Sequence, residues 1–216
     1  MSAEPPRSTC REPHWRQLRG RHLTRLAGDI AADRVDRDIV DLLLALNACP
    51  HVVTTSSCSG RIAVFAAPDP ADKRRGGILR SWHRRVGVSE LADAVEEALV
   101  TGHPYVWVSA QPPLLALYAC SHAVADSIAA LLEQAGFKYA GYRFSRAGRA
   151  YYITVHGTDR IDVPIRVKNV YLAGRPSREW IAGLASLLNT YLDRAKRSLE
   201  RLKSALSCTQ CFCRDA

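Results

Sequence analysis

Two apolar stretches joined by a short polar run decide the fold; they lie at residues 51–66 and read HVVTTSSCSGRIAVFA. The β-branched residues at 51–55 predict one strand, and the apolar residues at 61–66 predict a second strand. Residues 56–60 between them are rich in serine and end in glycine, so they predict a polar loop. The same order of two strands followed by a helix returns at 105–136.

The spacing of apolar residues predicts the remaining elements. Residues 67–77, which contain proline, aspartate, arginine and glycine, predict a loop. In the last helix apolar residues recur three and four apart from 181 to 206. We therefore expect the α+β (mixed α/β) class: a single mixed β-sheet flanked by helices, with a long C-terminal helix. We predict helices over 15–32, 35–46, 89–99, 124–135 and 177–206, and further strands over 105–109, 114–120, 137–145, 149–156 and 160–167.

Length and composition predict a folded protein. A chain of 216 residues, 47% of them hydrophobic, can bury about 70% of its unfolded surface, which excludes disorder and a small disulfide-stapled scaffold. We expect a disordered basic arm at 1–14, one folded domain at 15–206 and a cysteine-rich tail at 207–216. Residues 1–6 lack the apolar core of a secretion signal, and no apolar run reaches about 18 residues. We therefore expect a cytoplasmic protein with no membrane contact and mostly free thiols.

The distribution of charge indicates a nucleic-acid partner. The net charge is +9, and arginine far outnumbers lysine among the 30 basic residues. Arginine offers a planar fork that matches phosphate and a flat face that stacks on bases. Residues 73–85 carry basic side chains and no acid, 86–137 carry acids but no lysine or arginine, and 138–173 are again basic. If the basic segments converge, they create a field that attracts RNA.

The polar run at 54–61 suits an anionic ligand. Several hydroxyls, a thiol, a glycine and Arg61 lie within a few residues, and backbone N–H groups at such a turn can surround a phosphate or carboxylate. The alternative is a polar turn with no ligand. A cysteine phosphatase loop would need arginine where Val64 stands, and a nucleophile elbow lacks its first glycine. Neither a P-loop nor a Gly-x-Gly-x-x-Gly motif occurs, so we expect a fold other than the Rossmann type.

A second candidate segment follows at 73–85. Its glycines allow close approach of the backbone to a ligand, its tryptophan and arginines suit RNA, and His83 can move a proton near neutral pH. The alternative is a mobile basic loop followed by a partly buried tryptophan. The residues concerned are Lys73, Arg74, Arg75, Gly76, Gly77, Trp82, His83, Arg84 and Arg85.

Three cysteines end the chain with the spacing Cys208-x-x-Cys211-x-Cys213. Tetrahedral zinc needs a fourth ligand, which only a residue from elsewhere in the chain could supply. We expect no metal in this protein. A metal- or redox-responsive regulator built on the tail is kept as an alternative.

Over about residues 15–206 the chain resembles the wybutosine-synthesis methyltransferases of the archaeal type. The most specific part of the resemblance is the run Ser-Ser-Cys-Ser-Gly-Arg-Ile at 56–62. The cysteine-rich tail and the long N-terminal arm depart from the family pattern. The other matching features, in order, are Val35-Asp36, Leu46-Asn47, the basic segment from Lys73 to His83, Gly136-Phe137-Lys138 with Gly141, Val163-Pro164 and Asn189.

The resemblance implies a methyl transfer from S-adenosylmethionine to the N4 nitrogen of a tricyclic wybutosine precursor at position 37 of tRNA-Phe. The protein is then expected to bind the anticodon arm of that tRNA and to need no metal. The main alternative is a noncatalytic RNA-binding module in which the serine-rich loop holds a phosphate. As a hypothesis, Asp36 and His83 are the catalytic residues. The cofactor or the polar edge of the substrate contacts Ser57, Cys58, Ser59, Gly60 and Arg61, and the RNA contacts Lys73, Arg74, Arg75, Gly77, Trp82, Arg84 and Arg85.

Overall fold

A computed structural model describes residues 10–71 and 77–208, which fall into two compact units. The first unit contains the chain up to Ser59, Pro113–Thr158 and the chain from Arg197 onward. The second contains Gly60–Pro112 and Asp159–Lys196. Each unit is therefore assembled from stretches that are far apart in the sequence.

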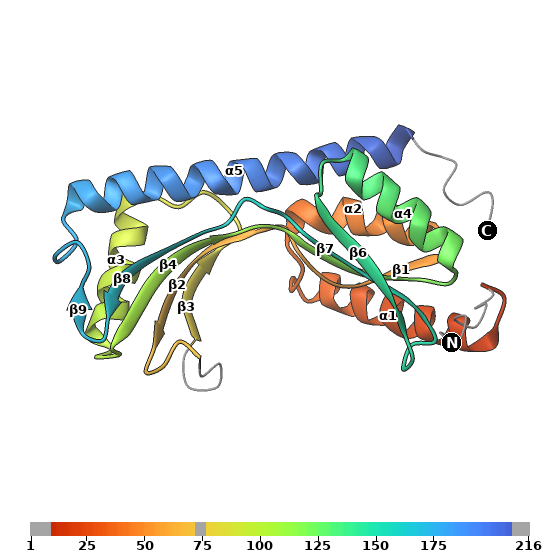
Figure 1. Ribbon diagram of the computed structural model, residues 1–216, viewed down its shortest axis with the longest axis horizontal. Coiled ribbons are helices and arrows are strands. Elements are labelled where there is room, and N and C mark those ends of the chain that lie inside the picture. Colours follow the sequence, from red (N-terminus) through yellow and green to blue (C-terminus); the bar gives the residue numbers. More distant parts are fainter. Residues whose placement is uncertain (1–9, 72–76, 209–216) are drawn as a thin grey trace, which may run out of the picture. The chain divides into compact units, whose positions relative to one another are not determined.

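The first unit is a four-stranded antiparallel sheet with helices on both faces (Figure 1). Helices α2 and α4 cover one face of this sheet, and α1 covers the other. The strand order is β1-β5-β7-β6. Its elements are α1 (Pro13–Ala31), α2 (Arg37–Ala48), β1 (Val52–Cys58), β5 (Leu114–Ala119), α4 (His122–Gln134), β6 (Tyr139–Ser145) and β7 (Ala150–His156).

Alternation along β5 explains why this sheet has helices on both sides. Leu115 and Leu117 lie in the core, whereas Tyr118, on the opposite face, contacts the ring of His22 on α1 at 5.8 Å between centroids. Helix α2 presents apolar residues three and four apart, so one stripe of the helix is buried. The stripe comprises Ile39, Leu42, Leu43 and Leu46.

The second unit is a five-stranded antiparallel sheet in the order β3-β2-β4-β8-β9. Helix α3 packs against it through a stripe of small and branched residues. The central strands β2 and β4 bury Ile62, Val64, Val106 and Val108, the alternate residues that face this helix. The elements are β2 (Arg61–Ala67), β3 (Gly77–Trp82), α3 (Val88–Val100), β4 (Tyr105–Gln111), β8 (Ile161–Val167) and β9 (Val170–Tyr171).

The last helix, α5 (Arg178–Cys208), contributes to both cores. Its apolar residues from Ile181 to Leu192 belong to the core of the second unit, and those from Leu199 to Leu206 belong to the core of the first. The long C-terminal helix predicted from the apolar spacing is confirmed. None of the described helices is long and apolar enough to cross a membrane.

The fold class agrees with the sequence prediction, but the sheet does not. In place of a single mixed sheet there are two sheets whose paired strands all run antiparallel. The two sheets separate within residues 51–66, because β1 pairs with β5 whereas β2 pairs with β3 and β4. Strand β3 begins at Gly77, the last residue of the expected loop, and its short and mostly exposed run of residues gives no strand pattern. Helix α1 begins at Pro13, two residues before the expected start.

The expectation of mostly free thiols is wrong for Cys10, Cys49 and Cys120, which are disulfide-bonded. Cys10 and Cys120 form a disulfide across 110 residues of sequence, whereas Cys58 remains a thiol. Sequence spacing alone gave no reason to pair these two, because the pairing depends on where α1 and β5 meet. Most of the predicted arm at 1–14 and of the predicted tail at 207–216 lies outside the described residues.

Candidate functional site

Strand β1 continues to Cys58 rather than ending at Thr55, so the predicted polar loop is shorter than expected. The register of β1 against β5 shifts between Thr54 and Ser57, which marks a β-bulge. The turn that follows consists of Ser59 and Gly60, and Gly60 adopts a φ of 90°, which glycine tolerates without steric cost. The hydroxyls and the thiol of this run are therefore carried mainly by a strand.

Asp36 fixes the turn at Ser59. Asp36 stands at the N-cap position of α2, yet its carboxylate makes no cap bond to that helix. Its Oδ2 accepts hydrogen bonds from the Ser59 N–H and the Ser59 Oγ, both at 2.9 Å. Ser59 is fully buried, so both bonds join a carboxylate to a group that water does not reach. Asp36 thus holds the turn in place, while its predicted role as a base stays a prediction.

Asn47 connects the other end of α2 to β1. Its Oδ1 accepts a hydrogen bond from the Thr54 N–H at 3.0 Å, and its Nδ2 donates to Thr54 Oγ1 at 2.6 Å and to Leu43 O at 2.8 Å. Both Asn47 and Thr54 are buried. Helix α2 is therefore bonded to the strand at Asn47 and to the turn after it at Asp36.

The hydroxyl of Ser57 forms no hydrogen bond within the described part of the chain. Its Oγ is buried and has no hydrogen-bond partner among residues 10–71 and 77–208. An unsatisfied buried hydroxyl costs about 1–3 kcal/mol, so such an atom invites a ligand. Ser57 and Cys58 lie opposite Leu115 and Leu114 of β5. This hydroxyl supports the prediction of a polar ligand at this run.

In the second unit, His83 bonds to Gly60. The distance from His83 Nδ1 to Gly60 O is 3.0 Å. A carbonyl oxygen only accepts, so Nδ1 carries the proton, and the lone pair of a neutral His83 ring then lies on Nε2. Nε2 is thus the atom at which this histidine can take up a proton.

Arg61 begins β2 and is oriented by the neighbouring strand. Its Nε donates a hydrogen bond to Gln111 Oε1 at 2.7 Å, and Arg61 lies opposite Gln111 in the β2–β4 register. This bond fixes the plane of the guanidinium while its terminal N–H groups keep the geometry that binds a carboxylate or phosphate in two-point fashion. The predicted anion contact of Arg61 is thus compatible with its position.

Arg84 and Glu90 form a two-point ion pair at the start of α3. Arg84 Nη2 donates to Glu90 Oε1 at 2.7 Å and Arg84 Nη1 to Glu90 Oε2 at 3.0 Å. The hydrogen bond from Arg84 is the largest cause that lowers the pKa of Glu90 to about 2; the Gly87 N–H adds to it. Arg84 is therefore paired with an acid that the sequence analysis did not assign to it.

The residues between β3 and α3 are held by α5. Asn189 Oδ1 accepts from the Val86 N–H at 2.9 Å, and Asn189 Nδ2 donates to Val86 O at 3.0 Å. One residue earlier, Arg85 Nη1 donates to Asp193 Oδ2 at 2.7 Å. Residues 83–87, which form neither helix nor strand until α3 begins, are thus fixed at Val86 by a buried amide.

The remaining predicted site residues are only partly placed. Gly77 and Trp82 begin and end β3, and Trp82 packs against the core of the second unit. The predictions for Lys73, Arg74 and Arg75 lie outside the described residues.

Several residues that position the candidate site escaped the sequence reasoning. Gln111 orients Arg61, and Glu90 and Asp193 pair with the two arginines. Their partners lie 50, 6 and 108 residues away, so no local pattern links them. Asn47 and Asn189 enter the sequence prediction only through the family resemblance. An asparagine within an apolar helical stripe is the one sequence signal that could have indicated them, since a buried amide needs partners.

Residues 16–208 match the family model described as Methyltransferase TYW3. The tRNA(Phe) 7-((3-amino-3-carboxypropyl)-4-demethylwyosine(37)-N(4))-methyltransferase of Archaeoglobus fulgidus is 32% identical over 185 residues, covering 84% of this chain and 89% of that protein. A protein of Pyrococcus abyssi with the same activity name is 30% identical over 172 residues, covering 80% of this chain and 85% of the relative. The structure of PH1069 from Pyrococcus horikoshii superposes with a TM-score of 0.77 at 28% identity, covering 89% of this chain and 96% of the other.

These matches define a class of protein, a methyltransferase with two antiparallel sheets and no dinucleotide-binding motif. The chain belongs to the TYW3 methyltransferase family, whose model matches nearly its whole length.

Proposed function

We propose that this protein transfers a methyl group from S-adenosylmethionine to the N4 nitrogen of a 4-demethylwyosine-type base at position 37 of tRNA-Phe. The observation that carries the proposal is the family match over 16–208, together with relatives whose names state this activity. The net charge of +9 is compatible with an RNA substrate. The anticodon arm, which contains position 37, is the part of the tRNA that we expect the protein to contact.

The residues around the turn after β1 fit the methyl donor. S-adenosylmethionine, the donor that methyltransferases typically use, supplies an electrophilic methyl group on a sulfonium sulfur and carries a carboxylate. Arg61 would hold this carboxylate, because Gln111 orients its guanidinium. Ser57 is kept as a predicted donor contact, because its buried hydroxyl has no partner among the described residues. Gly60, which adopts a positive φ, has no side chain, so the backbone here can come close to the donor.

The proton balance assigns a role to His83. Methylation of a ring nitrogen that carries hydrogen releases one proton, and a positioned base in its neutral form can accept it. His83, with its proton on Nδ1, would accept this proton at Nε2. Asp36 would act through Ser59 as a positioning residue.

The basic residues would bind the RNA. Arg84 and Arg85 are paired with acids in exposed ion pairs, which contribute little to stability and can be exchanged for phosphate. Trp82 would contribute a flat face for stacking, and Lys73, Arg74 and Arg75 further charge.

A methyl-transfer assay tests the proposal. The purified chain is incubated with S-adenosylmethionine labelled on the methyl group and with tRNA-Phe that carries the demethylated tricycle. The expected result is label in the base at position 37. The control is tRNA-Phe that already carries the methylated base. Binding of the tRNA without any product contradicts the proposal and favours a noncatalytic RNA-binding module.

Calorimetry tests the donor separately. We expect the protein to bind S-adenosylmethionine and to bind it more tightly when tRNA-Phe is present. The Arg61→Ala variant is expected to weaken donor binding. Donor binding that is unaffected in Arg61→Ala and in Ser57→Ala contradicts the assignment of the carboxylate site, while the methyl-transfer assay stays independent of it.

A further inference from the structure

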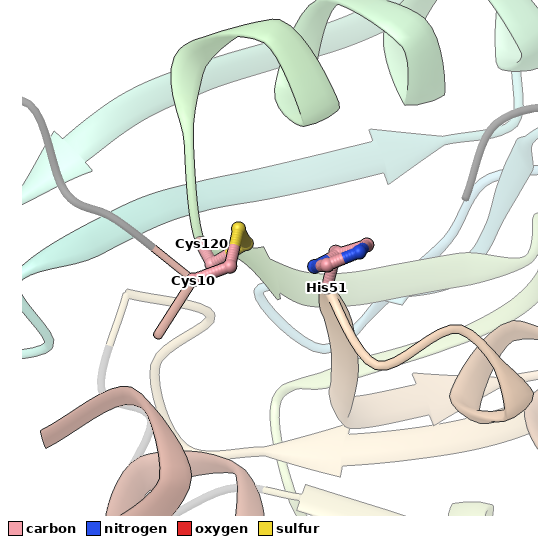
Figure 2. Close-up of side chains that lie close together, drawn as sticks. All are labelled: Cys10, His51 and Cys120. Carbon is pink, nitrogen blue, oxygen red and sulfur yellow. A yellow bond between two sulfur atoms is a disulfide. The ribbon is translucent and has the colours of Figure 1, made fainter. Parts of the chain in front are cut away.

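Two cysteines and a histidine meet in the first unit, away from the residues assigned above. Figure 2 shows the ring of His51 beside the Cys10–Cys120 disulfide, and one ligand atom from each of the three side chains lies within 4.8 Å of the others. Cys10 precedes α1, His51 precedes β1, and Cys120 follows β5. Three segments distant in the sequence thus bring together two sulfurs and an imidazole.

His51 has a ring nitrogen that the fold leaves unused. Its Nδ1 is shielded from solvent and has no hydrogen-bond partner in the described part of the chain. A buried polar atom without a partner is uncommon and calls for an explanation such as an ion that is not present. The neighbouring sulfurs of a disulfide are weak acceptors and do not satisfy it. A metal ion would satisfy it.

The backbone around this cluster is fixed, as a metal site requires. The Cys120 N–H donates to His51 O at 3.0 Å, which ties two of the three residues directly. Trp15 on α1 donates from Nε1 to Pro50 O at 3.0 Å, next to His51. Arg19 on the same helix donates from Nη2 to Asn47 O at 2.6 Å. Helix α1, which follows Cys10, is therefore docked on the turn that carries His51.

The donor set indicates which metal fits. Two thiolates and one imidazole are the ligands of zinc in tetrahedral sites, with Zn–S distances of about 2.3 Å and Zn–N distances of about 2.0 Å. We propose that Cys10, His51 and Cys120 bind one zinc ion when the Cys10–Cys120 disulfide is reduced. Zinc with two thiolates carries no net charge, so the ion does not oppose the nearby guanidinium of Arg19.

The chemistry of the exchange balances. A dithiol reductant transfers two electrons and two protons to the disulfide, which yields two cysteine thiols and the oxidised dithiol. Zinc binding then displaces the two thiol protons and forms two Zn–S bonds and one Zn–N bond. A water molecule completes the tetrahedron, and a cavity of about 280 Å³ lined by Cys10, Trp15, Arg19 and His51 gives it room.

The proposed ion differs from the metal considered for the C-terminal tail. The sequence predicts no metal, and methyl transfer needs none. Zinc at this cluster would instead hold the segment at Cys10 on the sheet when the disulfide is absent. The proposal does not depend on the methyl-transfer activity.

Cobalt binding tests the proposal, because Co²⁺ occupies zinc sites and absorbs visible light when thiolates bind it. The full chain is prepared with serine in place of Cys208, Cys211 and Cys213, so that the tail contributes no thiolate. After reduction and removal of the reductant without oxygen, we expect one Co²⁺ per chain, a thiolate-to-cobalt absorption band and displacement by Zn²⁺. The oxidised protein is expected to give no band.

Single substitutions identify the ligands. His51→Ala and Cys120→Ser, each in that background, are expected to weaken cobalt binding at least tenfold. Loss of a group that only supports a metal ligand already weakens metal affinity about 10–100-fold. Cys58→Ser is the matched control that removes a thiol elsewhere. Formation of the Cys10–Cys120 disulfide in oxidised His51→Ala, read by mass spectrometry of the peptides, verifies that this variant folds. Equal affinity in His51→Ala and the parent, loss of the band in Cys58→Ser, or no stoichiometric cobalt after reduction overturns the proposal.

Discussion

Asn47 in the first unit and Asn189 in the second each form hydrogen bonds to the backbone of a neighbouring segment, but the two segments differ in structure. Each is a buried amide on a helix, 7% exposed, that satisfies the backbone of a segment leading to candidate site residues. Asn47 bonds to Thr54, which also belongs to a strand paired with β5. Asn189 bonds to Val86, in a segment without secondary structure of its own.

The difference separates stability from positioning. Strand β1 keeps its sheet partners without Asn47, so the loss of this amide leaves its geometry in place and costs free energy of unfolding. Residues 83–87 depend on Asn189 for their only buried amide contact among the described residues. The loss of Asn189 should therefore loosen this segment at Val86 and shift the residues beside it, while His83 keeps its bond to Gly60 O.

Asn47→Ala should have the largest effect on stability. It removes three hydrogen bonds and leaves the buried Thr54 N–H without its side-chain partner. At about 1 kcal/mol per bond, the free energy of unfolding should fall by about 3 kcal/mol. Denaturant titration followed by circular dichroism measures this, with Thr190→Ala on the exposed side of α5 as the control. A loss below that of the control breaks the comparison.

His83→Ala should have the largest effect on the reaction at little cost in stability. Removing a general base lowers the rate by about 100-fold or more. Single-turnover methyl transfer measures the rate, and exogenous imidazole should restore part of it. The pH profile should lose the limb that reports ionisation of this base. An unchanged rate in His83→Ala shows that another group takes the proton.

Asn189→Ala should lower stability by about 2 kcal/mol, for two lost hydrogen bonds, and should also lower the methyl-transfer rate. Asn189→Asp keeps the acceptor for the Val86 N–H but loses the donor to Val86 O, so an intermediate result is expected. Equal activity in Asn189→Ala and Asn47→Ala, measured under conditions where both are folded, would remove the distinction between positioning and stability.

Arg85→Ala should weaken tRNA binding with little effect on folding. Its bond to Asp193 is an exposed ion pair, with the arginine side chain 68% exposed, so stability should change by less than about 1 kcal/mol. If Arg85 contacts one phosphate, the slope of log affinity against log salt should decrease by about 0.7–0.9. Filter binding over a salt series measures the slope, and Arg175→Ala is the matched control in another exposed pair.

The Arg84–Glu90 pair should give the smallest effect, visible only in acid. The pKa of Glu90 is lowered to about 2 from 4.5, so the pair stabilises the folded state above pH 4.5 and loses this contribution as pH falls through about 2. Because both side chains are exposed to solvent, which screens the pair, the contribution should be small. Stability measured between pH 5 and 2 should therefore depend less on pH in Arg84→Ala than in the parent. An identical slope contradicts the pairing.

The local part of this structure was predictable from sequence, and the long-range part was not. Helices α2, α3, α4 and α5 follow from apolar spacing. The turn at Gly60 follows from the glycine itself, which adopts a positive φ there. The division into two sheets depends on strand partners that are tens of residues apart. Strand β3 is a short edge strand whose residues are mostly exposed, so it shows no apolar alternation.

The candidate site shows the same limit. The serine-rich run at 56–62 and the segment ending in His83 were recognisable from their chemistry and from the family resemblance. The contacts that orient them, from Asp36 to Ser59 and from Gln111 to Arg61, are set by tertiary packing. The spacing of residues in one sequence does not show which distant polar side chains form hydrogen bonds with each other.

The link between Cys10 and Cys120 has a consequence for the unfolded chain. The disulfide closes a loop whose ends are 110 residues apart, and for a loop of about 100 residues the chain-entropy model assigns about 4.7 kcal/mol, lost from the denatured ensemble. Zinc on the same cysteines would close the loop only while the protein is folded, because unfolding disperses the ligands. The two states would therefore share a native geometry but differ in their unfolded chains. The oxidised chain would refold from a cross-linked loop, and the metal-bound chain would refold from a linear chain that has lost its zinc.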